Sequence, residues 1–189
     1  MKKGWKIVIV VLGIIIFIPL FFISSVQIGI FGRLPGKKEL ISFRNATASV
    51  VLSHEGETIG RFFSENRITI PLDQMPAHLI NALVATEDAR FYEHSGIDSR
   101  SLVRVVFKSI LFSDRSSGGG STITQQLAKN MYGRKDYRVF SVILNKTREV
   151  ILAKRIEKVF TKDKILELYL NTVSFGENIY GIEAASQRY

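Results

Sequence analysis

The hydrophobic pattern of the chain begins with one long apolar stretch. Residues 7–23 are almost wholly apolar, and no charged residue follows them before Arg33. A helix needs roughly 20 apolar residues to span the hydrocarbon core of a membrane. Lysines before the stretch, with Trp5 at its edge, are typical of an anchor whose N-terminus is cytoplasmic. The pattern predicts a cytoplasmic tail over residues 1–6 and a transmembrane anchor over residues 7–31.

A cleavable signal peptide is the alternative interpretation of this segment. Cleavage needs small residues at a defined spacing, and the stretch Ser24-Ser25-Val26 matches poorly. We therefore expect an uncleaved, single-pass anchor. The following residues 32–47 begin with the polar, turn-rich sequence GRLPGKK and are predicted to form a linker that leaves the membrane.

Alternating polar and apolar positions follow the linker. The stretches SVVLS (49–53) and ETIGRFF (57–63) flank His54 and Gly56 and are typical of a β-hairpin. His54 is then predicted to be a solvent-facing turn residue. Because the chain has only just left the anchor, we expect this hairpin near the membrane.

After Pro71 the apolar residues recur at helical spacing. Thr161 is a predicted N-cap, with Asp163 in the first turn of its helix. The sequence therefore predicts a mainly α fold with one small β element. The predicted helices cover residues 76–90, 99–112, 121–132, 141–160, a segment after residue 161 and part of 176–189, with a loop at 114–120.

Glu87 lies on the apolar stripe of the first of these helices. It follows Leu83 by four residues and Val84 by three, and Phe91 follows it by four. A carboxylate there is expected to be partly desolvated, and desolvation raises the pKa of a carboxyl group, which suits a general acid or base near neutral pH. Glu87 is thus a candidate for proton transfer. The alternative is that it pairs with a buried basic residue and only stabilises the fold.

Two further polar residues follow Glu87 closely. Asp88 is adjacent and can reach a different partner, whereas His94 comes seven residues later and could be a catalytic partner. We prefer a structural histidine that bonds a carboxylate or carbonyl and fixes a turn. His54 and His78 fall in unrelated segments, and the chain has no cysteine. These counts exclude a disulfide framework, a thiolate nucleophile and a cysteine-ligated metal.

A second carboxylate interrupts the apolar face of the predicted helix 141–160. Lys146 and Glu149 form an i, i+3 pair of opposite charge on that face. On an inward face the pair indicates a polar site, with a buried structural ion pair as the alternative. The remaining members of the face are Val142, Ala153, Ile156 and Phe160.

The stretch GGGSTITQQ (118–126) precedes a helix that continues as LAKN. Glycines let the backbone approach a ligand closely, Ser121 is the predicted helix cap, and a helix N-terminus favours anions. The stretch lacks the GK[ST] of a nucleotide P-loop, so we predict a phosphate or sugar cradle rather than a flexible linker. Further donors and one cation lie on neighbouring faces: Thr122, Gln125, Gln126 and Lys129.

Length and charge set broad limits on the function. The 189 residues, 46% of them hydrophobic, allow one ordinary domain with an appendage. The formal net charge of +9 suits nucleic acid, an anionic membrane surface or a phosphate-bearing substrate. The basic residues are dispersed and no nucleic-acid-binding motif is present, so we expect no nucleic-acid partner.

Three ordered motifs carry a resemblance to a known family. E-D-x-x-F-x-x-H-x-G is matched by Glu87, Asp88, Phe91, His94 and Gly96, G-x-S-T-I-T-Q-Q by Gly119 through Gln126, and K-x-x-I-L-E-x-Y-L-N by Lys162 through Asn171. Over about residues 48–189 the chain resembles the peptidoglycan glycosyltransferases, glycosyltransferase family 51. Members occur as single-activity enzymes and as the first catalytic domain of class A penicillin-binding proteins.

The resemblance implies a lysozyme-like, mostly helical domain on the outer face of the cytoplasmic membrane. It also implies polymerisation of lipid II into glycan strands, with inversion at the anomeric carbon and release of polyprenyl diphosphate. The implied partners are lipid II, the growing strand, the membrane and other cell-wall synthesis proteins. Mg²⁺ or another divalent cation, not tightly bound, is the implied cofactor.

The resemblance also assigns roles to residues of this chain. Glu87 is expected to be the general base that deprotonates the acceptor hydroxyl. Glu149 is expected to be the second acidic residue, near the donor diphosphate or its metal ion. The expected substrate-binding residues are Asp88, Arg104, Ser121, Thr122, Gln125, Gln126, Lys129 and Lys146. The expected structural residues are Phe91, His94, Gly96, Gly119 and Asn171.

Two departures from the family pattern are visible. The third family motif reads R-K-x-x-E, and here Asn145 stands where the arginine is expected. Arg148, or one of Arg134, Lys135 and Arg138, is expected to supply the lost charge. The second departure is that the chain ends at ASQRY, inside the last family motif, so we expect a domain that is incomplete at its C-terminus.

Two alternative functions follow from these observations. A lysozyme-like enzyme that cleaves glycan would also need one carboxyl group of raised pKa. An inactive, truncated membrane module that binds lipid II is the second alternative.

Overall fold

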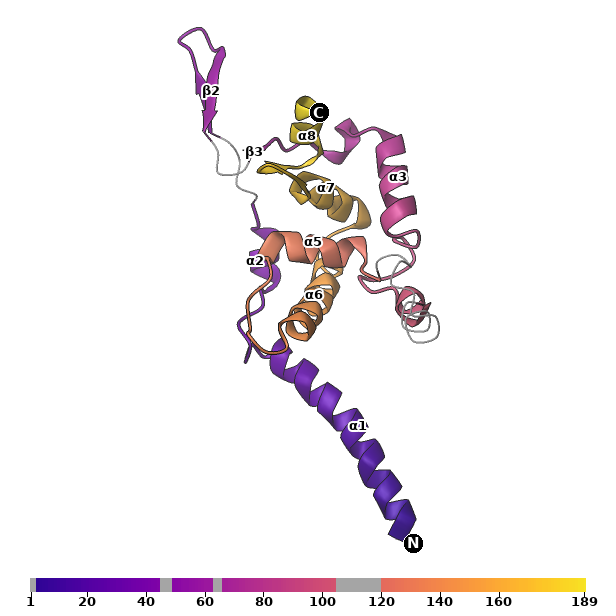
Figure 1. Cartoon of the computed structure of the whole chain (residues 1–189). Coiled ribbons are helices and arrows are strands. Elements are labelled where there is room, and N and C mark those ends of the chain that lie inside the picture. Colours follow the sequence, from indigo (N-terminus) through magenta and orange to yellow (C-terminus); the bar gives the residue numbers. More distant parts are fainter. Residues whose placement is uncertain (1–2, 45–48, 63–65, 105–119) are drawn as a thin grey trace.

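The computed structural model describes residues 3–44, 49–62, 66–104 and 120–189 (Figure 1). Helix α1 (Lys3–Gln27) projects from the rest of the molecule as a separate rod. Within its segment Gly4–Gln27, an 18-residue window has a mean hydropathy of 3.2 and is not covered by the protein, so the helix is long and apolar enough to cross a membrane. The helix ends before Gly29, whose φ of 90° is incompatible with continuing it.

The segment after α1 is packed against the helical body. It contains α2 (Lys37–Ile41) and buries the side chains of Leu34 and Leu40. Arg148 Nη1 donates a hydrogen bond of 2.8 Å to the Gly32 carbonyl oxygen. Residues 28–44 are therefore tied to the body by both apolar and polar contacts, in the region that the sequence suggested was a linker.

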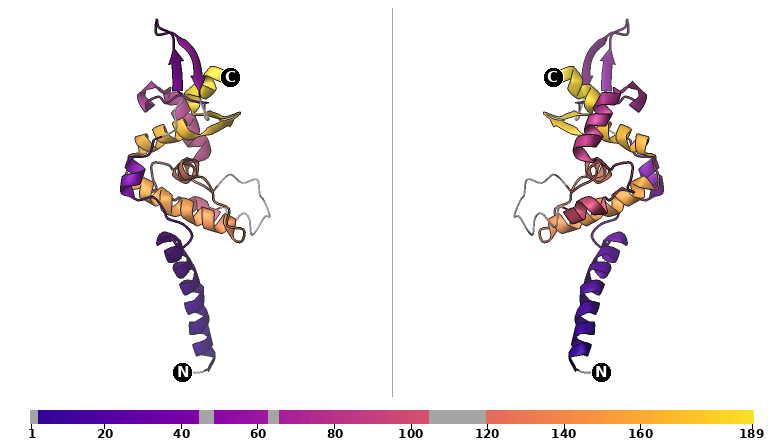
Figure 2. Two further views of the ribbon diagram at one scale, coloured as in Figure 1. Left: turned by 90° about the vertical axis from the view of Figure 1, so that its left-hand side faces the viewer. Right: turned by 90° about the vertical axis from the view of Figure 1, so that its right-hand side faces the viewer.

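The predicted hairpin is present as β1 (Ser49–Leu52) and β2 (Thr58–Phe62), which pair antiparallel. It lies at the end of the molecule opposite α1 (Figures 1 and 2). This placement differs from the expectation of a hairpin near the membrane. The reason is that residues 28–44 run along the helical body, with Leu40 buried, before the hairpin begins.

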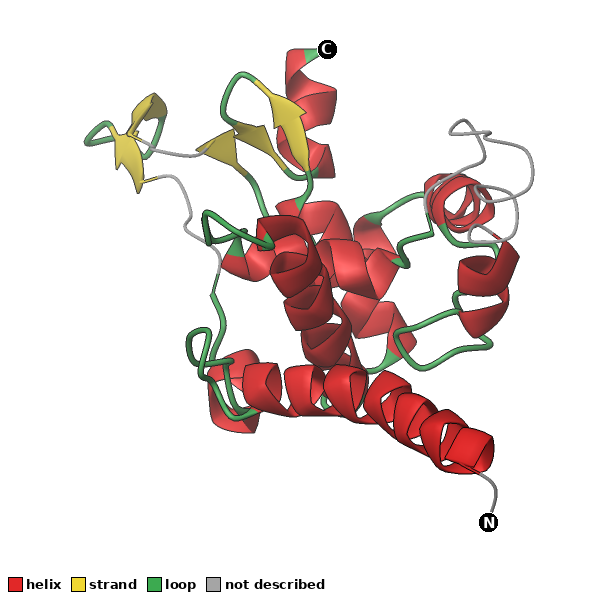
Figure 3. Ribbon diagram, turned by 60° about the horizontal axis from the view of Figure 1, so that its bottom comes forward, coloured by secondary structure: helices red, strands yellow, loops and turns green. Residues whose placement is uncertain are grey.

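The helical body is built around one central helix. Helix α5 (Ile123–Tyr132) packs on α6 (Ser141–Glu157) and on α7 (Lys162–Thr172) (Figures 1 and 3). Thr161 is the N-cap of α7, as predicted, because its hydroxyl oxygen accepts the backbone N–H of Lys164. Fully buried side chains between these helices include Phe91, Ile123, Leu127, Ile156, Ile165 and Leu166.

Further helical elements flank the body. Residues 72–74 form a 3₁₀ turn, η1 (Leu72–Gln74), which leads into α3 (Ala77–Glu87). Helix α8 (Ile182–Arg188) ends the chain. Residues 99–104 are helical, as predicted. The rest of the predicted helix 99–112, and all of the predicted loop 114–120 except its last residue, lie outside the described residues.

A small sheet that the sequence did not predict lies beside α8. Strands β3 (Asn66–Arg67), β5 (Ile179–Tyr180) and β4 (Ser174–Gly176) are arranged in this order, with β3 parallel to β5 and β4 antiparallel to it. Glu177 and Asn178 form the turn between β4 and β5 with positive φ values. Strands of two or three residues are too short to show an alternating pattern.

The first turn of α6 departs from the predicted face. Val142 was expected on the buried face but is 80% exposed, whereas Glu149 and Ala153 on that face are buried. The first turn of α6 extends past the body toward the end of α1, with which α6 is in contact (Figure 1). Among the described residues no helix encloses Val142, so its side chain stays exposed.

Candidate active site

A cavity of about 420 Å³ opens between α3, residues 98–104 and the start of α5. It brings together three segments that are separated in the sequence. The predicted site residues that line it are Glu87, Asp88, Arg104, Ser121 and Thr122.

Glu87 is the last residue of α3, and its side chain is exposed at this cavity. Its Oε2 accepts a hydrogen bond of 2.8 Å from Gln126 Nε2, and Gln126 Oε1 accepts the hydroxyl of Tyr169 at 3.0 Å. The expectation that Glu87 is desolvated was wrong. Leu83 and Val84 on the same stripe are only half-buried, so α3 lies too far out to enclose the carboxylate.

Tyr169 stabilises this arrangement as a hydrogen-bond donor. Burial, and then the negative charge of Glu87, raise the pKa of the Tyr169 hydroxyl above its ordinary value. The hydroxyl therefore stays protonated at neutral pH and continues to donate to Gln126. Gln126 is fixed at both ends, and its amide nitrogen is directed at Glu87.

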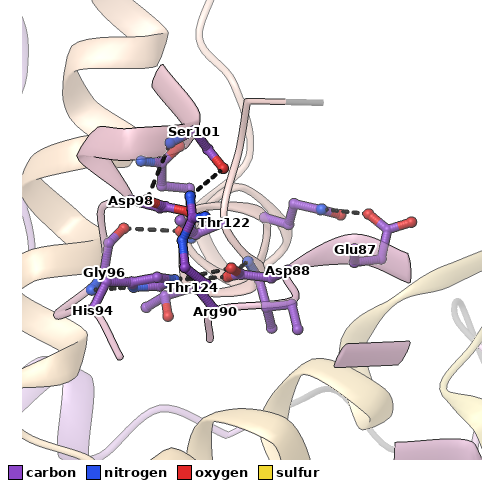
Figure 4. A network of polar contacts seen from close by, with 12 residues as sticks. Glu87, Asp88, Arg90, His94, Gly96, Asp98, Ser101, Thr122 and Thr124 are labelled. Atoms are coloured by element: carbon purple, nitrogen blue, oxygen red, sulfur yellow. Dashed lines mark hydrogen bonds and ion pairs between the residues drawn. The ribbon is translucent and has the colours of Figure 1, made fainter. Parts of the chain in front are cut away.

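Asp88 has a different environment from its neighbour. Both of its oxygens lie 3.0 Å from His94 Nε2, and Oδ2 also accepts the backbone N–H of Ile123 at 3.1 Å. His94 Nδ1 accepts the backbone N–H of Gly96, so the neutral ring with hydrogen on Nε2 satisfies both contacts. Asp88 thus joins the turn after α3 to the N-terminus of α5, where a negative charge is favourable (Figure 4).

The start of α5 is capped by Thr122, and the prediction of Ser121 as the cap was wrong. Thr122 Oγ1 accepts the backbone N–H of Gln125 at 3.2 Å and donates to the Gly96 carbonyl at 2.8 Å. Because Thr122 is the cap, Ser121 precedes the helix, and its hydroxyl is free to accept Lys146 Nζ at 2.6 Å.

The pair Lys146 and Glu149 is connected to the cavity through Ser121. Lys146 Nζ lies 3.4 Å from Glu149 Oε2, and Arg134 Nε donates to Glu149 Oε1 at 2.8 Å. The Glu149 side chain is only 7% exposed, and a buried charge needs a partner. Here Lys146 and Arg134 compensate it. Among the residues expected to replace the charge missing at position 145, Arg134 contacts this carboxylate, whereas Arg148 donates to the backbone after α1.

Asn145 is turned away from this cluster. Its Oδ1 accepts the backbone N–H of Lys135 at 3.0 Å, and its Nδ2 donates to the Lys135 carbonyl at 2.8 Å and the Ser141 carbonyl at 2.9 Å. The amide therefore closes the loop between α5 and α6.

Three predicted substrate-binding residues lie at different depths. Arg104 is exposed, lines the cavity and donates to Ser101 Oγ. Lys129 is exposed near the end of α5, outside the cavity lining. Gln125 is 1% exposed, and neither polar atom of its side chain has a partner within the described part of the chain.

The sequence reasoning missed an ion pair at the rim of the cavity. Arg90 Nη2 donates to Asp98 Oδ2 at 2.6 Å and to Ser101 Oγ at 3.2 Å (Figure 4). Burial opposes ionisation of Asp98, but hydrogen bonds from Ser101 and Arg90 outweigh it and lower the pKa of Asp98 to about 2. A turn without helical or strand periodicity has no pattern that could have revealed this pair.

The expected structural residues form the support beneath the cavity. Phe91 is fully buried, and Lys162 Nζ lies 4.3 Å from the centre of its ring while donating to the His94 carbonyl at 2.7 Å. Asn171 is 1% exposed and pairs with both backbone groups of Ile70. Gly119 lies outside the described residues.

The residues around Glu149 do not fit a resident metal ion. Both carboxylate oxygens already face cations, Arg134 and Lys146. Within the described ranges, no group of three or more histidine, aspartate or glutamate side chains is placed to hold a metal. Mg²⁺ needs near-octahedral oxygen ligation, and this donor set does not provide it.

Residues 55–189 match the family model described as Transglycosylase, and the chain belongs to this family. The motif turn at 87–96, the start of α5 and helix α7 all lie within the matched range.

The relatives include two kinds of penicillin-binding protein. The chain is 39% identical over all of its 189 residues to penicillin-binding protein 1F of Bacillus subtilis (strain 168), covering 25% of that protein. It is 42% identical over 157 residues to penicillin-binding protein 1A of Escherichia coli (strain K12), covering 83% of this chain and 18% of that protein. Penicillin-binding protein 1A of Aquifex aeolicus (strain VF5) is 40% identical over 184 residues, covering 97% of this chain and 24% of that protein. The chain therefore spans about a quarter or less of the length of these relatives.

Proposed function

We propose that this domain is a peptidoglycan glycosyltransferase, which joins lipid II units into glycan strands with inversion at the anomeric carbon and release of polyprenyl diphosphate. The observation that carries the proposal is the cavity itself. Its lining combines an exposed carboxylate, Glu87, with Ser121, whose hydroxyl accepts a hydrogen bond from Lys146 Nζ. A base and a cationic anion-binding wall are the two requirements of this transfer.

Glu87 acts as the general base in this proposal. The acceptor sugar hydroxyl gives its proton to Glu87 while its oxygen forms the new bond to the anomeric carbon of the donor. The bond between that carbon and the diphosphate oxygen breaks, and the diphosphate leaves with the electron pair. Gln126, held by Tyr169, keeps the carboxylate directed at the cavity.

Cationic side chains stabilise the charge that develops on the leaving diphosphate. Arg104 lines the cavity, and Lys146 contacts Ser121 in its wall. Because the donor set around Glu149 does not suit a resident ion, we place the divalent cation with the diphosphate oxygens of the substrate. Activity that is lost with a chelator and restored by Mg²⁺, without a change in the protein's thermal stability, would support this assignment.

The helix α1 makes the chain a membrane-anchored protein, and we propose that the helical body lies on the outer face of the cytoplasmic membrane. Tyr137 in the α5–α6 loop donates a hydrogen bond to the Phe31 carbonyl, which holds this loop beside the end of α1. Apolar side chains are exposed there: Ile28, Ile30, Val139, Phe140, Val142 and Ile143. Basic residues around them, including Arg33 and Arg138, suit anionic head groups.

The partners proposed on this basis are lipid II, the growing glycan strand, the membrane and other cell-wall synthesis proteins. The exposed carboxylate and the cationic wall match the acceptor sugar and the donor diphosphate respectively.

The decisive experiment uses the detergent-solubilised chain with labelled lipid II and Mg²⁺, and detects glycan polymer on a gel. The Glu87→Gln variant should lose at least about 10²-fold in rate, because it keeps the shape of the side chain but cannot accept a proton. Glu93→Gln is the matched control, since Glu93 is exposed in the same turn but does not line the cavity. Equal rates for the two variants would contradict the role of Glu87.

The same assay separates the alternative functions. Cleavage of preformed glycan with no polymer from lipid II would identify a glycan-cleaving enzyme. Binding of lipid II without turnover, unchanged in Glu87→Gln, would identify a binding module.

A further inference from the structure

The loop between α5 and α6 carries two linked features that the family resemblance does not explain. Asn145 stands where an arginine is expected. Its side chain is buried, and its amide forms hydrogen bonds with backbone groups of this loop. An arginine has no acceptor atom and could not receive the N–H of Lys135 as Asn145 Oδ1 does. The residue at 145 therefore shapes the loop instead of placing a charge in the site.

The loop that Asn145 closes also carries a positively charged side chain, that of Arg134, which contacts Glu149. Lys135 is held by the amide through both its N–H and its carbonyl, and Arg134 is the preceding residue. Arg134 Nε reaches Oε1 of the buried Glu149 at 2.8 Å. Lys146 lies at the other oxygen and also contacts Ser121 in the cavity wall. Loop, helix α6 and cavity wall are thus joined by one series of polar contacts.

The Arg134 side chain is both paired and accessible. It is 56% exposed, although its partner Glu149 is buried. A guanidinium has five N–H donors in a planar fork, and the contact with Glu149 uses Nε. Such a fork can donate two parallel hydrogen bonds to the oxygens of a phosphate, whereas a lysine ammonium interacts with a phosphate as a point charge.

The other basic residues near this position are arranged differently. Arg148 donates to the carbonyl oxygens of Phe31 and Gly32 and so anchors the segment after α1. Arg138 is exposed, and its backbone N–H is held by Asp136. Of these arginines, Arg134 is the one with a contact to Glu149 in the described part of the chain.

We propose that Arg134 is a diphosphate-binding residue and that Asn145 is the positioning residue that sets the loop carrying it. This inference rests on the proposed function, since it supplies the donor diphosphate that Arg134 binds. Asn145 acts only through Arg134.

The test measures binding of farnesyl diphosphate, with farnesyl monophosphate for comparison, to the full detergent-solubilised chain by calorimetry. Arg134→Gln should weaken diphosphate binding about tenfold or more, as expected for loss of a charge-assisted hydrogen bond. Arg134→Lys should recover part of the loss. The affinity for the monophosphate should change less than the affinity for the diphosphate when Arg134 is substituted. Arg138→Gln, which removes the same charge from the same loop, is the matched control and should bind as the wild type does.

The role of Asn145 is tested by a double-mutant cycle. Asn145→Ala should weaken diphosphate binding, but Arg134→Gln combined with Asn145→Ala should be no weaker than Arg134→Gln alone, because the amide acts through the arginine. Thermal unfolding of each variant identifies any that fails to fold. If Asn145→Ala fails, the more conservative Asn145→Ser replaces it in the cycle.

Three results would overturn the inference: wild-type chain that does not bind the diphosphate, equal affinities of Arg134→Gln and Arg138→Gln, or fully additive losses in the cycle. These results are distinct from failure of the proposed function. A wild-type chain that binds diphosphate through Arg134 but forms no glycan polymer would contradict the glycosyltransferase proposal and leave the assignment of Arg134 in place.

Discussion

At the scale of single residues, two adjacent carboxylates have opposite environments. Helix α3 ends at Glu87, and Asp88 leaves the helical conformation with φ −158° and ψ 71°. This change of backbone direction sends Asp88 inward to His94 and to the N-terminus of α5. Glu87 stays at the surface of the cavity, where Gln126 is its hydrogen-bond partner among the described residues. The end of one helix thus separates a structural carboxylate from an accessible one.

A pH dependence of stability is predicted from Asp98. Its pKa is lowered from 3.8 to about 2 in the folded protein, so its contribution is complete above about pH 4 and is lost as the pH falls toward 2. Asp98→Asn should remove a contribution of about 2 kcal/mol at pH 5 and nearly none at pH 2. Urea unfolding of both proteins across this range measures the difference.

The control for this prediction is Asp73→Asn, because Asp73 is an exposed carboxylate in η1. Its unfolding free energy should run parallel to that of the wild type. A constant difference between Asp98→Asn and wild type at every pH would show that the ion pair with Arg90 does not couple to protonation.

At the scale of elements, the turn after α3 is fitted closely to α6. Gly96 has a φ of 86°, and a Cβ atom there would lie 3.0 Å from the Ala153 carbonyl oxygen. The Gly96 carbonyl accepts Thr122 Oγ1, so the turn also fixes the start of α5. One glycine therefore allows the turn, α5 and α6 to meet beneath the cavity.

Gly96→Ala is expected to destabilise the domain by about 2–4 kcal/mol, through a left-handed backbone and overpacking against Ala153. The matched control is Gly56→Ala, where φ is also positive at 84° but no atom lies within 4 Å of the added Cβ. It should cost only about 1–2 kcal/mol from the backbone. Chemical denaturation measures both, and equal losses would contradict the packing argument.

At the scale of the whole molecule, the anchor and the body meet at one end. The α5–α6 loop, which carries Arg134, is joined to the segment after α1 by the hydrogen bond from Tyr137 to Phe31. The exposed apolar side chains of this loop and of residues 28–30 lie together at this end. The proposed diphosphate-binding loop is therefore positioned by the same contacts that attach the body to its anchor.

Contact of this loop with the bilayer is tested by tryptophan fluorescence. Trp5 is the single tryptophan of the chain, so Trp5→Phe combined with Phe140→Trp reports on the loop alone. In vesicles we expect blue-shifted emission that brominated lipids quench. Trp5→Phe combined with Tyr189→Trp is the control, because α8 lies far from α1 and is expected to emit as in water (Figure 1). Water-like emission from position 140 would contradict membrane contact.

Much of the architecture was predictable because it depends on local spacing. The apolar stretch predicted α1, the alternation predicted the β1–β2 hairpin, and the threonine at 161 predicted the start of α7. These features need only neighbouring residues, so they are readable without the fold. The β3–β5–β4 sheet escaped prediction because its strands are too short for a period to appear.

The amino-acid sequence by itself determined the anchor, the order of helices and the motifs that identify the family, since each depends on residue types at short fixed separations. Only the tertiary structure decided that Glu87 is exposed, that Thr122 caps α5, and that Arg134 meets Glu149. Each of these depends on how deeply a helix packs or on which distant backbone group a side chain reaches. Such contacts are set by the packing of the whole chain, and no local spacing encodes them.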